Sequence, residues 1–304
     1  MSKITKQDVV DWANKYLGPE SYAIIYKREG KDPDEQKIAA PKITPIVTNR
    51  DSQSEFLSEI QTSQVQPIEP VFVDYKKDMS QFEAQPGIDV LYKKNETNDI
   101  FTLIYVFNTG TENDPALNLA FNYLSYLGTD KMTAEEIASE MYDIACSFYM
   151  NAGANQSSIQ ITGLSENMGK AMEIVEGLIA GAKPDEAILE NCKADMLKSR
   201  ADAKLNQSRC FGALQRYLFY GGDFIRRTTL TDPALQALTS EQLLAKIGGL
   251  MGKQHEVLYY GPQKEAEVKS ALAEHHKVAT DLQPLEKKFS TLLPTDANKV
   301  VLAQ

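Results

Sequence analysis

Few side chains in this sequence are suited to hydrolytic chemistry. Its three histidines are His255, His275 and His276. A hydrolytic metal site needs two or three converging His, Cys or carboxylate ligands and a base that activates water. The histidine spacing fits neither HxxEH nor HExxH, and no GxSxG, Walker A loop or GxGxxG occurs. We therefore predict that the histidines lie at the surface and that the chain contains no catalytic, cofactor-binding or metal-binding residue.

The three cysteines, Cys146, Cys192 and Cys210, also lack the spacing of a reactive site. Their number is odd, and no CxxC pair is present. Cys192 and Cys210 fall on the apolar stripes of expected helices. We interpret the cysteines as buried free thiols rather than as metal ligands or redox groups.

Composition and charge disfavour two classes of partner, nucleic acids and the membrane interior. The 304 residues contain 32 basic and 42 acidic side chains, a net charge of −10, which disfavours a nucleic-acid partner. No apolar run approaches the roughly 18 residues that span a bilayer, and residues 1–8 lack the apolar segment of a signal peptide. We predict no membrane span.

A helix–glycine–strand unit occurs twice in one register. Thr5 begins an expected helix that ends at Gly18, and the β-rich run 22–26 follows. Thr239 begins a second helix with a capping-box pattern, followed by Gly252 and the expected strand 257–260. Thr239 lies 234 positions after Thr5, and the same offset relates the two glycines. Chance similarity of two common units is the alternative.

The repeat predicts a modular chain cut within its modules. A Pro-x-Glu linker and a strand follow both units, at 67–69 and near 90–92, then at 284–286 and 300–302. We interpret the chain as a fragment of a protein with tandem modules. The predicted parts are a helix–strand tail of a preceding module (1–30), a linker (31–86), a complete module (87–277), and a linker with the first strand of a truncated module (278–304).

Apolar periodicity in the complete module predicts the element order β-β-α-α-β-β-α-α-α-α-β-α. Residues 87–94 and 101–109 are expected to form a hairpin-like strand pair, and 147–152 and 158–163 a second pair. Thr133 is expected to cap one helix, and Pro184 to lie in the first turn of a long one. Because hairpins predominate, we predict an α+β fold, a mainly antiparallel sheet with helices packed on one face.

One helix and the start of the next resemble a known family. The run Leu119-Ala120-Phe121-Asn122-Tyr123, then Gly128-Thr129 and Thr133-Ala134-Glu135-Glu136-Ile137, is similar to the signature region of M16 (insulinase-like, pitrilysin-like) zinc peptidases. In catalytic modules of that family the first helix carries HxxEH. The resemblance places Leu119 and Tyr123 at the two histidine ligands and Asn122 at the general base. It covers most of 87–304.

The third ligand of the family is a glutamate about 75 residues further along the chain. That position falls near Lys198 and Ser199, and neither is a carboxylate. The resemblance therefore implies a module without the zinc motif, as in the non-catalytic half of such peptidases. It implies that four homologous modules close as two halves around a peptide chamber, with zinc in the catalytic half of the parent protein.

The resemblance also implies partners and a binding edge. The partners are the remaining modules of the same polypeptide and an unfolded peptide substrate. In the catalytic half, peptide adds to an exposed strand edge, and the corresponding residues here are Met150, Asn151, Ala152 and Gly153. Coverage of this edge by the linker is the alternative.

Two other functions remain open from the sequence. The chain would belong to an M16-like structural or assembly subunit if the parent lacks HxxEH, and a third reading is an enzyme with an unrecognised site. On the first reading the parent is a zinc metallopeptidase and this chain alone is inactive. The compartment is left open between the periplasm or cell envelope and the cytoplasm.

Overall fold

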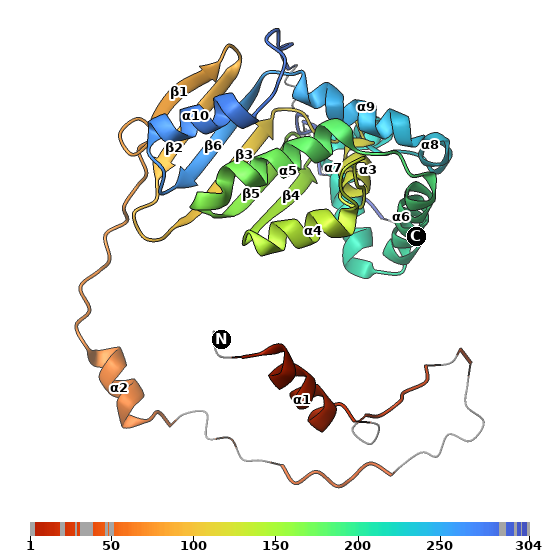
Figure 1. The fold of residues 1–304 in the computed structure, drawn as a ribbon. Coiled ribbons are helices and arrows are strands. Elements are labelled where there is room, and N and C mark those ends of the chain that lie inside the picture. The colour runs from red at the N-terminus through yellow and green to blue at the C-terminus, as the bar shows by residue number, and fades with distance from the viewer. Residues whose placement is uncertain are drawn as a thin grey trace. The chain divides into compact units, whose positions relative to one another are not determined.

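A computed structural model describes residues 4–18, 22–27, 29–30, 39–45, 48, 52–285, 290–294, 297–298 and 300–302. The chain divides into two compact units, residues 1–69 and residues 70–304. Each unit is described by itself (Figure 1).

The second unit is built on a six-stranded sheet with the order β1-β2-β6-β3-β5-β4. Its strands are β1 (Ser80–Gln85), β2 (Ile88–Lys94), β3 (Ile100–Phe107), β4 (Cys146–Ala152), β5 (Ser157–Leu164) and β6 (His255–Gly261). Neighbouring strands are antiparallel except β2 and β6, which run parallel. The predicted mainly antiparallel α+β fold is confirmed.

Strict alternation of side chains gives the sheet one buried face. In β3, Phe101, Leu103, Tyr105 and Phe107 are buried while the residues between them are not. In β6, Val257 and Tyr259 are buried by the same period of two. These inward side chains form one core with the helices.

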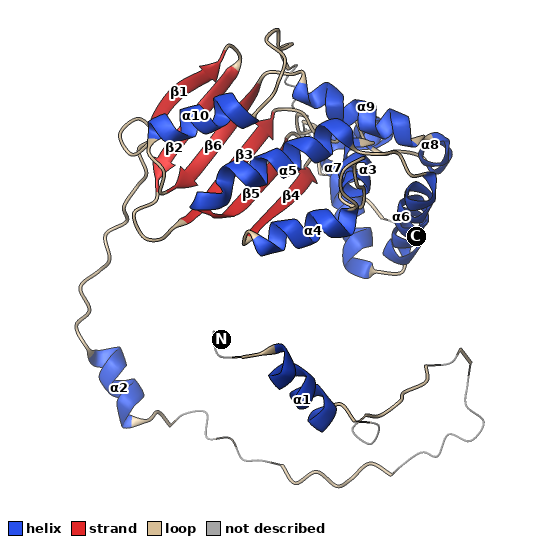
Figure 2. Cartoon of the chain, viewed as in Figure 1, coloured by secondary structure: helices blue, strands red, loops and turns tan. Residues whose placement is uncertain are grey.

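The helices of this unit pack on this buried face and against one another. They are α3 (Leu117–Leu124), α4 (Ala134–Asp143), α5 (Met168–Gly181), α6 (Glu186–Lys204), α7 (Gln207–Thr228), α8 (Asp232–Ala237), α9 (Ser240–Met251) and α10 (Glu265–His275), with a short 3-10 turn, η1 (Ser165–Asn167), before α5. Figure 2 shows α5 and α10 lying across one side of the strands. Among the described residues of this unit, no helix is drawn on the opposite side of the sheet.

Helix starts follow the local sequence. Thr133 and Thr239 each form a capping box, with Glu136 and Gln242 as the respective reciprocal partners. The N-cap of α6 is Asp185, whose carboxylate accepts the N–H groups of Ala187 and Ile188. Pro184 therefore precedes the cap, and its predicted place in the first turn is wrong.

Three predictions about the strands and helices are corrected. The strands at 87–94 and 101–109 are not a hairpin pair, because β6 lies between β2 and β3 and bonds to both. The last part of the expected linker forms β1, which pairs with β2. A short helix, α8, adds one element before α9. Each correction involves pairing between residues that are distant in sequence or a very short element.

The described residues of the first unit form two helices, α1 (Lys6–Tyr16) and α2 (Glu55–Thr62), neither with a buried residue. Residues 22–26 belong to no strand, and nor do the described residues 300–302 of the second unit. The division into modules stays a prediction.

Within the described ranges, no helix combines the length and apolar character that crossing a bilayer requires.

Candidate functional site

Helix α3 carries the residues that the sequence places at the zinc-binding positions. Leu119 and Tyr123 are 1% and 0% exposed, whereas Asn122 points to the surface. The helix packs against β4, α6 and α9. The structure therefore brings α3 and the long helix α6 together, as the resemblance requires.

The hydroxyl of Tyr123 is hydrogen-bonded to groups at the starts of two other helices. It accepts a hydrogen bond from the N–H of Asp185 at 2.7 Å and lies 2.8 Å from Oγ of Ser240. Asp185 caps α6, and Ser240 begins α9. One phenol thus joins three helices and uses its hydrogen-bonding capacity within the protein.

The residues at these positions do not fit a zinc ion. Leu119 has no donor atom, and the Tyr123 oxygen is already occupied by two protein partners. Zinc sites use thiolate, imidazole or carboxylate ligands. Among the described residues, no three His, Cys, Asp or Glu side chains are grouped closely enough to hold a metal.

The residues of α6 that face the cavity beside α3 are not Lys198 and Ser199, which the family spacing indicates. Lys198 and Ser199 are exposed and line a separate outer groove with Arg209. Met196 and Arg200 instead line the cavity beside α3. The guanidinium of Arg200 donates to the carbonyl of Leu230 at 2.7 Å and pairs with Asp232. A helix positions residues by a period of 3.6, so a count uncertain by one or two selects another face.

A cavity of about 450 Å³ opens where α3, α6 and α7 meet the end of β4. Asn118 of α3 and Ala152 and Gly153 after β4 line it, and Tyr220 and Phe224 of α7 line its other side. Two of the four predicted edge residues therefore border this cavity. Neither Arg200 nor the aromatic side chains Tyr220 and Phe224 of α7 were predicted from the sequence as part of this cavity.

Strand β4 is an edge of the sheet and pairs only with β5 among the described strands. Leu164 N–H donates to the carbonyl of Ala145 at 3.3 Å, and Gly153 N–H donates to that of Gln156 at 2.8 Å. Both pairs continue the β4–β5 register, and hydrogen-bonded pairs alternate in an antiparallel ladder. The odd-numbered residues of β4 therefore bond to β5.

The even-numbered residues of β4 direct their backbone groups to the free edge. Their N–H and C=O groups point away from β5, and no hydrogen bond from another described residue of 70–304 reaches them. These residues are Cys146, Phe148, Met150 and Ala152. Such a row of unpaired groups is a template for an added strand.

The four predicted edge residues thus have different roles. Met150 and Ala152 present backbone groups to the free edge, whereas Asn151 bonds to β5. Gly153 uses its N–H with Gln156 and its carbonyl with Thr111, so the free edge ends at Ala152.

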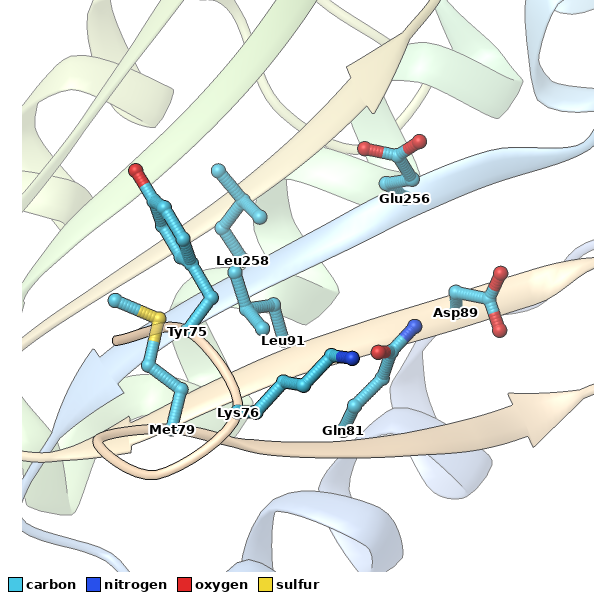
Figure 3. A pocket seen from close by; sticks show the side chains of 8 residues that line it. All are labelled: Tyr75, Lys76, Met79, Gln81, Asp89, Leu91, Glu256 and Leu258. Carbon is cyan, nitrogen blue, oxygen red and sulfur yellow. The ribbon is translucent and has the colours of Figure 1, made fainter. Parts of the chain in front are cut away.

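The face of the sheet without helices has a hollow of its own, of about 570 Å³. Figure 3 shows Tyr75 and Met79 lying over Leu91 and Leu258, with Asp89 and Glu256 further along the strands. Asp89 and Glu256 are partners in the β2–β6 register. The sequence did not indicate this hollow, because the segment before β1 was interpreted as linker.

Two histidines are buried, so their predicted surface position is wrong. His255 and His276 are 4% and 5% exposed, and their Nε2 atoms lie 2.8 Å apart. Nδ1 of His276 lies 2.6 Å from the Glu176 carboxylate, and Nδ1 of His255 lies 2.8 Å from the carbonyl of Lys253. His255 lies two residues before Val257 in β6, so its side chain points to the same buried face. This alternation could have predicted its burial from the sequence. His275 is half-buried.

Burial lowers the pKa of His255 to about 4, with a smaller contribution in the same direction from His276. His255 is therefore neutral above that pH. Its Nδ1–H donates to Lys253, so its Nε2 accepts from His276. The hydrogen bond between Nδ1 of His276 and the Glu176 carboxylate completes this buried chain of hydrogen bonds.

The cysteines divide into two kinds. Cys146 and Cys192 are buried, and burial raises the pKa of each thiol. Cys210 is exposed, so its predicted burial is wrong. The apolar stripe of α7 that includes it is largely exposed in this unit.

The sequence and the fold were compared with known proteins. No sequence family model and no curated protein sequence match the chain. Solved structures do match. The peptidase M16 inactive domain from Pseudomonas fluorescens superposes with a TM-score of 0.60 at 17% identity, over 71% of this chain and 54% of that one. The fold is that of M16 peptidase modules.

Other M16-type structures extend the match. The periplasmic protease PqqL from Escherichia coli aligns with 96% of this chain and 30% of its own, at a TM-score of 0.58 and 12% identity. A putative M16-like peptidase from Alicyclobacillus acidocaldarius aligns with 67% of this chain and 51% of its own, at 0.53 and 13%. This chain therefore spans about half or less of the length of these M16-type proteins.

Proposed function

We propose that this chain is a non-catalytic part of an M16-type zinc endopeptidase and helps to form its peptide-binding chamber. The observation that carries the proposal is α3, which packs against α6 and β4 but has Leu119 and Tyr123 buried at the ligand positions. The zinc ion belongs, on this proposal, to the catalytic half of the parent protein. The chain alone does not hydrolyse peptides.

Peptide binding is assigned to the free edge of β4. The N–H and C=O groups of alternate residues from Cys146 to Ala152 point outward, in the pattern that an added strand would use. The cavity at the Ala152 end, with Tyr220 and Phe224, offers apolar and aromatic surface to side chains of the same peptide. Because backbone groups form the hydrogen bonds, binding at this edge is expected to depend little on the peptide sequence.

The similarity to an inactive M16 domain supports this assignment at the level of the fold. That protein and PqqL are longer than this chain, which accounts for the remaining modules of one polypeptide as partners. A location in the periplasm or cell envelope is a further part of the proposal, because PqqL is a periplasmic protease.

The test is fluorescence anisotropy with a labelled, unstructured peptide that contains no proline. The wild-type chain is expected to bind it, and Met150→Pro is expected to weaken binding at least about fivefold, because proline removes an N–H from the free edge. Met150→Ala is the matched control, since it shortens the side chain and keeps the N–H. Equal affinities of the two variants would argue against pairing along β4.

A second measurement concerns the chemistry. We expect no stoichiometric zinc after dialysis and no cleavage of the peptide above the blank. Stoichiometric zinc that survives dialysis would contradict the assignment of a non-catalytic part. A parent reading frame without HxxEH, together with no peptide binding, would favour an M16-like structural subunit.

A further inference from the structure

Residues 276–285, the exit segment, follow α10 and lie against the core of the second unit. The N–H of Gln283 donates to the carbonyl of Gly252 at 3.0 Å, and the carbonyl of Gln283 accepts the N–H of Gln254 at 2.9 Å. Leu282 is buried and belongs to the hydrophobic core. These contacts hold the exit segment beside the start of β6, where His255 lies.

His276 is the first residue of the exit segment and the C-cap of α10. Its buried ring packs on that of Tyr105 of β3, with the ring centroids 4.2 Å apart. Its Nε2 lies 2.8 Å from Nε2 of His255 on β6, and its Nδ1 lies 2.6 Å from the carboxylate of Glu176 on α5. One side chain thus attaches the exit segment to three elements of the core.

The hydrogen bonds around these histidines form a chain of three. They join the carbonyl of Lys253 to Nδ1 of His255, His255 to His276, and His276 to Glu176. Each hydrogen bond contains one proton, and with three protons the group has no net charge. A fourth proton on His255 would set two N–H donors against each other at the 2.8 Å contact with His276. It would also leave a net positive charge in a buried place.

The titratable groups that face His255 come from three elements. They are His276 at the end of α10, Glu176 on α5 and Tyr105 on β3. From β2, Ile88 lies opposite His255 in the register, and its side chain is apolar. Among these groups one carboxylate serves two imidazoles, so a further proton has no second counter-ion.

We propose that His255, His276 and Glu176 form a pH-sensitive switch that holds the exit segment on the core at neutral pH and releases it in acid. In the released state His255 is open to water and can take up a proton without facing His276. Release is local, because the strands of the sheet keep their partners and β6 stays paired with β2 and β3.

The pKa of His255 sets the direction and the pH range of the switch. Burial lowers this pKa to about 4, whereas the ordinary value of a histidine is 6.5. Because the released state binds the proton more readily between these values, release becomes more favourable as the pH falls from 6.5 to 4. The released population is expected to rise about 20-fold between pH 7 and pH 5.

The exit segment leads from the complete module to the linker predicted at 278–304. Its release would detach the first part of that linker from the core and loosen the connection to the residues that follow. The inference goes beyond the proposed function, because it concerns this connection and requires neither peptide nor zinc.

Hydrogen exchange of the intact chain, followed by mass spectrometry at pH 7, 6 and 5, tests the local release. After correction for the intrinsic effect of pH on exchange, peptides from 277–285 are expected to exchange about 20-fold faster at pH 5 than at pH 7. In β5, which exchanges through global unfolding, protection at pH 5 is expected to remain at least about 100-fold greater than in the exit segment. Exit-segment exchange that does not depend on pH, or that equals the exchange of β5, would overturn the inference.

Two substitutions separate the titration of His255 from a general weakening of the exit segment. His255→Gln keeps a group that can donate to Lys253 and accept from His276 but does not titrate, so the ratio of exchange rates at pH 5 and pH 7 is expected to fall below about threefold. Leu282→Ala removes buried apolar contact and is expected to speed exchange at every pH while leaving that ratio at about 20. A His255→Gln chain with the wild-type ratio would contradict the role of His255. The wild-type profile decides whether release occurs, and it does so even where a variant fails to fold.

Discussion

The hydroxyl of Tyr123 lies 2.8 Å from Oγ of Ser240, although the two residues are 117 positions apart in the sequence. The same oxygen accepts the N–H of Asp185 at 2.7 Å. A phenol at a position that the resemblance assigns to a zinc ligand therefore connects α3 to the starts of α6 and α9. The connection joins three helices and contributes to the stability of the second unit.

Removing the Tyr123 hydroxyl is expected to destabilise the second unit. In Tyr123→Phe, the N–H of Asp185 loses a partner in a buried setting, at a cost of about 1–3 kcal/mol in the free energy of unfolding. Urea denaturation measures this change. Tyr126→Phe is the control, because Tyr126 is exposed and should change stability by less than about 0.5 kcal/mol. Equal effects of the two substitutions would show that the hydrogen bonds of Tyr123 contribute little.

Restoring the family motif on α3 is not expected to restore zinc binding. The triple variant Leu119→His, Asn122→Glu, Tyr123→His supplies two imidazoles. The facing side of α6, however, carries Met196 and Arg200, which is a cation already paired with Asp232. Zinc content after dialysis is expected to stay below about 0.1 per chain, and the variant is expected to unfold more readily than the wild type. Tight stoichiometric zinc would mean that another carboxylate reaches the site.

Stability is expected to fall as the solution is acidified from pH 6.5 to pH 4. Burial lowers the pKa of folded His255 to about 4, so the unfolded chain, with an ordinary value of 6.5, binds a proton more readily between these limits. With respect to His255, the free energy of unfolding has its full value above pH 6.5. It decreases by up to roughly 3 kcal/mol as the pH falls to 4. Urea denaturation at several pH values measures this slope.

Substitution of His255 tests the pH prediction. His255→Gln is expected to reduce the slope, because the glutamine side chain does not titrate. The groups facing His255 are His276, beyond it Glu176 on α5, and the rings of Tyr105 and Phe107 on β3. A slope that persists unchanged in His255→Gln would contradict the assignment of the effect to His255.

The three thiols are expected to react at very different rates. Cys210 is exposed and should react with a thiol reagent in the native protein, whereas Cys146 and Cys192 are buried with a raised pKa. Counting labelled thiols by mass spectrometry at pH 7.5 should give one fast site, and three after denaturation. Rapid labelling of Cys192 without denaturant would show that α6 opens readily.

Local features were predicted from the sequence because they depend on neighbours along the chain. The capping boxes at Thr133 and Thr239, the alternation in β5 and the buried helix α3 arise from residues within a few positions of each other. The choice of an α+β fold followed from the order of these elements. The expectation that Leu119 and Tyr123 bind no zinc likewise depends on residue identity alone.

The placement of elements far apart in sequence could not be predicted in the same way. The sequence did not show that β6 separates β2 from β3, or that Met196 and Arg200, rather than Lys198, face the cavity beside α3. His255 and His276 came together because β6 and the end of α10 pack on the same core. Such pairings are set by long-range packing and hydrogen bonding, for which a periodic pattern contains no partner information.

The sequence by itself determined that this chain has short-range signals for an α+β module and no side chains suited to zinc at the family's motif. Only the tertiary structure decided that β4 is an edge strand with unpaired groups at alternate residues, and that the hydroxyl of Tyr123 fills its site by bonding to Asp185 and Ser240. The physical reason is that residue type fixes which bonds a side chain can make, whereas the folded packing of distant segments fixes which of them are made.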